Sequence, residues 1–407
     1  MPRPPVYLDH AATTPVRPEV REAMLPYLGG EAFGNPSSPH RFGRTARAAL
    51  EQARREVAAA AGAEPAQVFF TSGGTEADNL AVIGTALAAR TAGRAMRVAV
   101  AATEHKAVLG AAHAVVHLGG EDVILPVRPD GALEWDPLDL ALAGHPALIS
   151  VMWVNNETGV IQAVARIGQR CRDAGVPYHT DAVQALGNVP VEFARLGAEF
   201  LTLSGHKIGA PKGVGALLVR DPALLEPIIH GGGQQLGLRP GTENIAGAVG
   251  FGRAAELAHR EQPEHATRLA GLRTRLLEGL RREVPDLVVT AESAGHASHI
   301  LNLCVPGADS EALLMHFDLA GIAVSSGSAC TTGAVEPSHV LTAMGVPREL
   351  ATGALRFSFG RETTTADVDQ AIGCFADVVK KVRRLAEVLA RRPADAPPSR
   401  PSAGAAR

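Results

Sequence analysis

The sequence predicts an α/β protein built on a mostly parallel β-sheet with helices on both faces. Five short apolar runs alternate with helix-like stretches along the first two thirds of the 407-residue chain. Crossover connections between parallel strands place helices over the faces of a sheet, so this alternation is typical of such a fold. In chain order the runs are "QVFFT", "RVAVAA", "ALISVMWV", "VPYHT" and "EFLTLS".

Length, composition and charge set the class of protein. A hydrophobic content of 46% allows substantial cores, and the length suggests about two to three domain-sized units. The formal net charge of −3 gives no indication of a nucleic-acid or membrane partner. No run approaches a membrane span, and the N-terminal "MPRPPVYLDHAATTP" lacks the apolar core of a signal peptide. We therefore expect a cytoplasmic protein that acts on a small molecule.

A second domain is expected near Arg260, where the alternation weakens. A long helix there has one leucine face, and a last helix from about Asp367 to Leu389 follows the capping residues Thr363 to Thr365. We expect residues 15–260 to form a large cofactor-binding domain and residues 1–14 with 261–390 a smaller one. Residues 391–407 are rich in Pro, Ala, Ser and Arg, which predicts a disordered tail. The leucine face comprises Leu269, Leu272, Leu276, Leu277 and Leu280.

Residues directly after the apolar runs are candidate site residues. Ligands bind at the carboxyl ends of the strands in open α/β sheets, so side chains at these positions should converge. The candidates are Thr71 to Glu76, Thr103 to Lys106, Asn155 to Glu157, Asp181 with Gln184, and Ser204 to Lys207.

Lys207 is the first candidate for covalent chemistry. The chain has only five lysines among its 39 basic residues, so lysine is not its default surface cation. Lys207 directly follows an apolar strand, where partial burial favours a neutral, nucleophilic amine. The pattern indicates a lysine that forms a Schiff base; the alternative is a strand-end lysine that reaches solvent.

The residues at the other strand ends match the groups that pyridoxal phosphate requires. It needs a lysine for its aldehyde, a carboxylate for its pyridine nitrogen, a phosphate cradle and a flat group against its ring. Asp181 suits the nitrogen, although it could instead cap a helix, and Gln184 suits the phenolic oxygen. The helix opened by Gly74 and Thr75 suits the phosphate. Ser204 and His206 could add donors to the phosphate, and His105 could stack on the ring or move protons, unless it is only structural.

The four cysteines do not form a disulfide framework, and no two are spaced as CxxC. Cys171 and Cys374 fall in predicted helices and Cys304 in a predicted strand, where a small apolar residue packs well. Cys330 differs, because the small polar residues of "VSSGSACTTGAVEPS" predict a loop that leaves the thiol accessible.

Other chemistries have no matching motif. The chain lacks a Walker A loop and the HExxH, GxSxG and GxGxxG patterns. His113 and His117 share one face of a predicted helix, but no third ligand is near them in sequence, so no metal site is expected.

These residues lie in motifs that resemble the cysteine desulfurases of the class V pyridoxal-phosphate aminotransferase superfamily, in family order from about Val6 to Leu389. The resemblance implies a type I pyridoxal-phosphate transferase fold, with a mostly parallel seven-stranded sheet and a smaller α+β domain. The loop around Cys330 is similar to the branch with a longer, mobile loop. The motifs are "YLDHAATTPV", "FGNPSSPHRFG", "FTSGGTEADNLA", "TEHKAV", "VNNETGVIQ", "HTDAVQALG", "SGHKIGAPKGVGAL", "HGGGQQLGLRPGTEN", "SSGSACTTG" and "LRFSFGR".

The resemblance implies a role for each matching residue. It places Asn35 and Arg356 on the substrate carboxylate, which the planar fork of arginine suits. Thr242 would reach the cofactor phosphate of a neighbouring subunit, which implies a homodimer. Without the motif around it, Arg356 would be an ordinary ion pair. The cofactor assignments are Lys207 at the aldehyde, Asp181 at the pyridine nitrogen, His105 over the ring, Gln184 with Asn156 at the phenolic oxygen, and Gly74, Thr75, Ser204 and His206 at the phosphate.

The implied reaction removes sulfur from L-cysteine, leaves a persulfide on Cys330 and releases L-alanine. Lys207 would act as the base after its release from the cofactor, and His105 would handle protons. The sulfur acceptor would be an iron–sulfur scaffold, a tRNA-thiolating enzyme or a related protein. The alternatives are a selenocysteine lyase, another enzyme of the superfamily, or a non-catalytic sulfur-carrying or scaffold protein. Because Cys330 must meet both substrate and acceptor, we expect its loop to be poorly ordered or displaced from the cofactor when substrate is absent.

Overall fold

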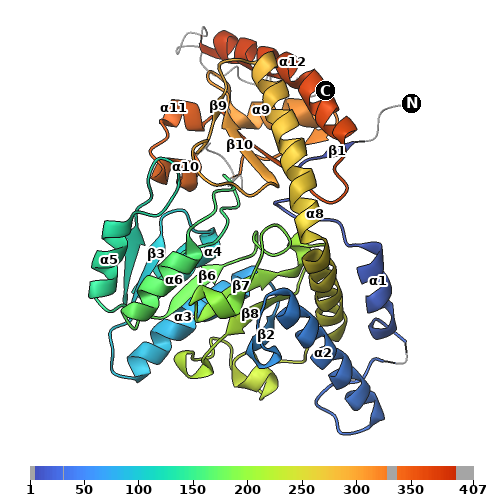
Figure 1. The fold of residues 1–407 in the computed structure, drawn as a ribbon, viewed down its shortest axis with the longest axis vertical. Coiled ribbons are helices and arrows are strands. Elements are labelled where there is room, and N and C mark those ends of the chain that lie inside the picture. The colour runs from blue at the N-terminus through green and yellow to red at the C-terminus, as the bar shows by residue number, and fades with distance from the viewer. Residues whose placement is uncertain (1–4, 31, 328–336, 391–407) are drawn as a thin grey trace, which may run out of the picture.

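The computed structural model describes residues 5–30, 32–327 and 337–390 (Figure 1). The strands are β1 (Val6–Tyr7), β2 (Val68–Thr71), β3 (Arg97–Ala101), β4 (Glu121–Leu125), β5 (Leu148–Ser150), β6 (Tyr178–Asp181), β7 (Phe200–Ser204), β8 (Gly215–Val219), β9 (Val288–Val289), β10 (Ile300–Cys304), β11 (Ile322–Ala323) and β12 (Ala354–Ser358). The α-helices are α1 (Pro18–Met24), α2 (Arg41–Ala60), α3 (Gly74–Thr91), α4 (Lys106–His117), α5 (Trp135–Ala143), α6 (Val164–Asp173), α7 (Phe193–Leu196), α8 (Ile245–Glu283), α9 (Ser310–Leu319), α10 (His339–Ala343), α11 (Arg348–Ala351) and α12 (Thr365–Ala390). Short 3₁₀ helices are η1 (Leu25–Tyr27), η2 (Pro65–Gln67), η3 (Gly205–Lys207), η4 (Pro222–Leu224) and η5 (Gln234–Gly237).

A seven-stranded sheet forms the centre of the larger part, in the order β2-β8-β7-β6-β5-β3-β4. Only β8 runs antiparallel to its neighbours β2 and β7; the other pairs are parallel. The predicted α/β fold with a mostly parallel sheet is therefore confirmed. The five apolar runs correspond to β2, β3, β5, β6 and β7, whereas β4 and β8 were not among them.

Alternate residues of the central strands pack into two different cores, as the two-residue period of a strand requires. In β3, Val98 and Val100 face a core shared with α3 and α4, while Ala99 and Ala101 face the opposite core. That opposite core includes buried residues of α2, α5, α6, α7 and the first half of α8. Helices thus cover both faces of the sheet, as Figure 1 shows.

A separate hydrophobic core lies at the other end of the molecule. It combines β10 and β12, which pair antiparallel, with α9, α12 and the second half of α8 (Figure 1). The predicted leucine face is buried at Leu269, Leu272, Leu276 and Leu280, and Leu277 is partly buried.

Helix α8 connects the two ends as one element of 39 residues, with Pro263 inside it. The helix begins 15 residues before Arg260, at Ile245, so the proposed boundary at residues 260/261 lies inside a continuous helix. The division into two domains remains a proposal. The predicted tail, residues 391–407, lies outside the described residues.

Candidate functional site

The site forms where parallel strands of the large sheet end. β6 ends at Asp181, and β7 ends at Ser204 and runs directly into η3, which carries Lys207. The helix that follows β3 is preceded by His105 as its N-cap residue. Because β3, β6 and β7 share one direction, their ends meet at one edge of the sheet.

Lys207 is held at this edge by the N-terminal segment. Its Nζ donates to the carbonyl oxygens of Ala11 at 2.6 Å and Ala12 at 2.8 Å. Burial, and then the positive charge of Arg356, lower the pKa of Lys207 to about 8. A lysine with this pKa is partly neutral near physiological pH and can act as a nucleophile.

Asp181 and His105 lie within electrostatic reach of Lys207. Asp181 is buried, and its Oδ1 accepts a hydrogen bond from the Val183 N–H at 2.8 Å. Burial raises the pKa of Asp181, while His105 and Lys207 act to lower it. The His105 ring accepts the Ala107 N–H through Nδ1 at 3.1 Å, and loss of hydration lowers its pKa. A carboxylate, an imidazole and a low-pKa amine therefore converge.

The start of α3 lies against the same strand ends. A Cβ added at Gly74 would lie 3.0 Å from Val183 Cγ2 and 3.6 Å from Ser204 Cβ, so the first turn of α3 closely approaches β7. No side chain caps this helix, which leaves its first backbone N–H groups for an anion; Thr75 is exposed beside them.

His206 brings no positive charge to this end of α3. Its Nδ1 is 3.1 Å from Thr13 Oγ1, and burial lowers its pKa to about 4, so its ring is neutral near pH 7.

Gln184 makes its contacts through its side-chain amide, whereas Asn156 makes its contact through its backbone carbonyl. Gln184 is buried; its Nε2 donates to the Ala11 carbonyl at 2.9 Å, and its Oε1 lies 3.0 Å from His299 Nε2. Asn156 is half-buried, and its carbonyl accepts from Arg356 at 2.7 Å.

Arg356 is a buried guanidinium close to the site. Its second terminal nitrogen bonds Asp9 Oδ1 at 2.7 Å, and its buried Nε has no partner among the described residues. Arg356 therefore forms the ion pair that the sequence suggested as its alternative role. Its free Nε–H is still able to donate to a further acceptor.

Three predicted site residues are not brought to this cluster by the described contacts. Asn35 is exposed, and its side chain accepts the Ser37 N–H at 2.9 Å. Thr242 is exposed in the segment after η5. Cys330, with the prediction about its loop, lies outside the described residues.

The other three cysteines are poor nucleophiles. Burial raises the pKa of Cys171 to about 12 and that of Cys304 to about 11, and it also raises the pKa of Cys374. The three thiols lie in α6, β10 and α12, as predicted. Within the described ranges no group of three or more His, Cys, Asp or Glu side chains could hold a metal ion.

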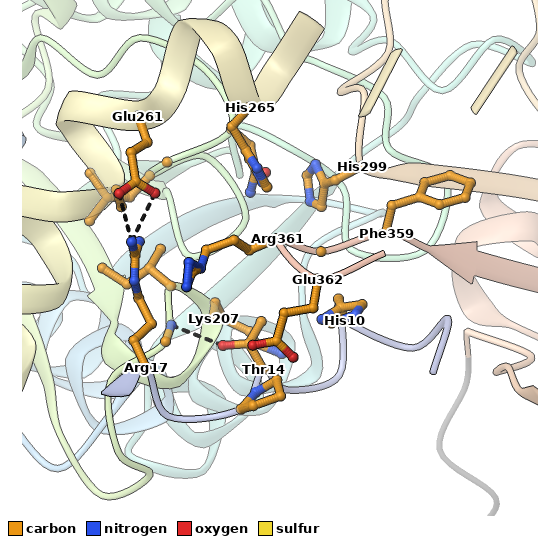
Figure 2. Close-up of a pocket in the computed structure, with 18 of the residues that line it drawn as sticks. His10, Thr14, Arg17, Lys207, Glu261, His265, His299, Phe359, Arg361 and Glu362 are labelled. Atoms are coloured by element: carbon orange, nitrogen blue, oxygen red, sulfur yellow. Dashed lines mark hydrogen bonds and ion pairs between the residues drawn. The ribbon is translucent and has the colours of Figure 1, made fainter. Parts of the chain in front are cut away.

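A cavity adjoins Lys207 (Figure 2). It is lined by His10, Thr14, Gln184, Lys207, His265 and His299, among others, and an Arg17–Glu261 ion pair of 2.7 Å closes one wall. Neither Asp181 nor His105 lines it, so it reaches Lys207 from a different side.

Sequence reasoning missed four contributors: Asp9, the Ala11 carbonyl, His299 and His339. Asp9 and Ala11 lie in "YLDHAATTPV", a motif that could have pointed to them. His339 Nε2 lies 2.9 Å from the Glu104 carbonyl, beside His105. No local pattern distinguishes His299 or His339 from structural histidines.

The residues present fit pyridoxal phosphate. The low-pKa Lys207 amine matches an aldehyde, and the buried Asp181 carboxylate matches a protonated ring nitrogen. The uncapped start of α3 packs directly on Ser204, which matches a phosphate.

Comparisons with known proteins agree with this geometry. The family model for aminotransferase class-V matches residues 6–371. The chain is 42% identical over 380 residues to "Cysteine desulfurase IscS" of Dictyoglomus turgidum, covering 93% of this chain and 96% of the relative. It is 43% identical over 385 residues to "IscS-like cysteine desulfurase" of Mycobacterium tuberculosis, covering 93% and 98%.

Solved structures agree as well. A NifS-like protein from Rickettsia africae is 31% identical, with a TM-score of 0.81, over 92% of this chain and 99% of that one. DndA from Streptomyces lividans is 39% identical, with a TM-score of 0.72, over 87% and 99%. SspA in complex with cysteine is 32% identical, with a TM-score of 0.77, over 87% and 98%.

Proposed function

This chain belongs to the class-V aminotransferase family, and we propose that it is a pyridoxal-phosphate-dependent cysteine desulfurase. The observation that carries the proposal is the partly buried Lys207 amine, with a pKa of about 8, within electrostatic reach of Asp181 and His105. Relatives at 42% and 43% identity, matched over almost their whole length, are named cysteine desulfurases.

The side chains of the site have distinct tasks. When bound, pyridoxal phosphate supplies an electron sink for the bonds around the substrate α-carbon. Lys207 would hold the aldehyde and would be the base for the substrate α-proton, and the Asp181 carboxylate would keep the ring nitrogen protonated. His105 would pack against the ring and move protons, while Arg356 would offer its free Nε–H to the substrate carboxylate.

The net reaction balances without an external oxidant. The carbon–sulfur bond of L-cysteine breaks, and a sulfur–sulfur bond forms on the Cys330 thiol. The β-carbon is reduced to the methyl group of L-alanine as the sulfur is oxidised to the sulfane level. Among the cysteines only Cys330 is assigned this role, because burial raises the pKa of the other three thiols.

The proposal also includes the acceptor of the sulfur and the cellular location of the protein. The persulfide is passed to an iron–sulfur scaffold or a tRNA-thiolating enzyme. A cytoplasmic location fits the three free thiols of the described residues, because reducing compartments keep cysteines unpaired. None of the described helices is both long and apolar enough to cross a membrane.

A homodimer is part of the proposal. The described contacts within one chain do not bring Asn35 or Thr242 to Lys207, so we propose that Thr242 serves the site of a second copy. The segments next to them line one surface groove, to which Pro36, Ser37, Leu236 and Glu243 contribute. Exposed apolar side chains occur in the groove and in the segment before Asn35: Leu236, which lines the groove, is 79% exposed, Phe33 is 68% exposed and Leu28 is 62% exposed. Large apolar side chains left exposed in neighbouring segments are typical of an interaction surface. We assign it to a second copy, whose site Thr242 would complete.

The test is turnover of L-cysteine by the purified protein loaded with pyridoxal phosphate, with alanine and sulfide both measured. Lys207→Arg should lower alanine formation by at least about 100-fold, because the base is lost. Cys330→Ala should abolish sulfur transfer, whereas Cys374→Ala should not. Normal alanine formation and sulfur transfer by Cys330→Ala would refute the assignment. Selenocysteine, assayed in parallel, distinguishes a selenocysteine lyase.

A further inference from the structure

His299 lies outside the groups that the reaction uses, yet a chain of hydrogen bonds joins it to Lys207. The connection runs from Lys207 Nζ to the Ala11 carbonyl at 2.6 Å, from that carbonyl to Gln184 Nε2 at 2.9 Å, and from Gln184 Oε1 to His299 Nε2 at 3.0 Å. Ala11, Gln184 and His299 are each at least nine-tenths buried.

The Ala11 carbonyl fixes the orientation of the Gln184 amide. A carbonyl oxygen has two lone pairs, and here Lys207 and Gln184 use one each. The Ala11 peptide is itself anchored, since its N–H donates to Ser358 Oγ at 2.9 Å. Only the NH₂ group of Gln184 can donate to a carbonyl, so its Oε1 must point to His299.

The same reasoning fixes the tautomer of His299. An amide oxygen only accepts, so the proton of the imidazole must lie on Nε2. Burial lowers the pKa of His299 to about 3, and the charges of His265 on α8, Arg356 on β12, Lys207 on η3 and His10 act in the same direction. The ring is therefore neutral near pH 7. Its Nδ1 has no partner among the described residues, and the residue borders the cavity of Figure 2.

We propose that His299 is a positioning residue: it donates to Gln184 and so holds the amide where its second N–H can serve the phenolic oxygen of the cofactor. This inference rests on the proposed function. One Gln184 N–H bonds Ala11, so only the other remains for the cofactor. His299 immediately precedes β10 of the second core, whereas Gln184 lies in the turn that follows β6 of the large sheet. The hydrogen bond thus fixes the second core against the cofactor site.

The test is a pH titration of the absorbance band of the protein-bound cofactor. A hydrogen bond to the ionised phenolic oxygen favours the ionised form, so losing it raises the pKa of the chromophore. Gln184→Leu and His299→Leu should each lower the acid constant by about three- to tenfold, the size expected for one net hydrogen bond. His299→Gln, which keeps a donor near the Nε2 position, should recover most of the change.

A double variant separates positioning from general packing. If His299 acts through Gln184, His299→Leu should cause no further shift in a Gln184→Leu background. His265→Leu is the matched control, because His265 borders the same cavity, whereas the histidine that contacts Gln184 Oε1 is His299. Additive shifts, or an equal shift in His265→Leu, would overturn the inference.

The possible failures are distinguishable. A wild-type protein that forms no such band would overturn the proposed function together with this inference. A shift in Gln184→Leu without one in His299→Leu would overturn this inference alone. If His299→Leu does not fold, as judged by circular dichroism, the His299→Gln variant decides: a shift as large as that of Gln184→Leu contradicts the proposal.

Discussion

At the scale of single residues, the charge of Lys207 is set by burial and by Arg356. We expect Arg356→Gln to raise the pKa of Lys207 above about 8, because the guanidinium is the largest charge acting to lower it. Competitive acetylation of the cofactor-free protein over a pH series, read by peptide mass spectrometry, measures this pKa. The exposed Lys380 and Lys381 are internal references. An unchanged Lys207 profile would mean that burial alone sets its pKa.

Two buried carboxyl groups accompany Asp181 and make stability depend on pH. Glu104 accepts the Met152 N–H at 2.7 Å, and burial, followed by the charge of Asp181, raises its pKa well above the usual value; burial does the same for Asp78. A raised folded-state pKa contributes stability that is present below the unfolded pKa, and that stability is lost as pH rises through the folded pKa.

Glu104→Gln should remove this loss. The variant should therefore gain stability relative to wild type as pH rises from about 5 to 8, as measured by urea unfolding. The exposed Glu278→Gln is the matched control and should follow the wild-type curve. A Glu104→Gln curve parallel to wild type would show that Glu104 does not take up a proton on folding.

The sequence pointed to those candidate-site residues that end a strand or come soon after one. Lys207, Asp181 and His105 could be found because the period of the apolar runs marks where each strand ends. The Ala11 carbonyl could not, because a backbone acceptor has no signature in composition. His299 and Asp9 come from segments remote in sequence, so only the folded chain brings them to the site.

At the scale of elements, the sequence predicted the strands whose residues form a clear apolar run. β4 was missed because Glu121 and Asp122 interrupt its apolar pattern at a sheet edge, and β8 because its apolar residues follow a glycine-rich stretch. The continuity of α8 was missed because Pro263 and the change of neighbours near Arg260 resemble a boundary.

The start of α12 gives a test at this scale. Thr364 accepts the Asp367 N–H at 3.2 Å, and Asp367 accepts the Thr364 N–H at 2.8 Å, which is a reciprocal cap within the predicted capping residues. Thr364→Ala should destabilise the protein by about 1 kcal/mol. Thermal unfolding measures the loss. Thr365→Ala makes the same chemical change one residue later, without that cap, and should lose clearly less; equal losses would argue against the cap.

At the scale of the whole molecule, the site lies between two hydrophobic cores. The large sheet supplies Lys207 and Asp181, while the second core supplies Arg356 from β12 and His299 beside β10. The N-terminal segment joins them: Ala11 and Ala12 bind Lys207, and Asp9 binds Arg356. A shift of either core would therefore alter the amine and the guanidinium together.

The exposed apolar cluster beside α2 gives the last prediction, which concerns assembly. If Leu28 and Phe33 lie at the contact between two copies, a charge there should convert the dimer to a monomer, because an unpaired carboxylate is costly to bury. Sedimentation or light scattering should give twice the chain mass for wild type and one chain mass for Phe33→Asp. Leu140→Asp is the control: Leu140 is 77% exposed on α5, which follows the edge strand β4, whereas α2 precedes β2 at the other edge of the large sheet (Figure 1). Because Thr242 would complete the site of the second copy, the monomeric variant should also bind pyridoxal phosphate more weakly. A wild-type monomer with full activity would refute both the interface and the shared site.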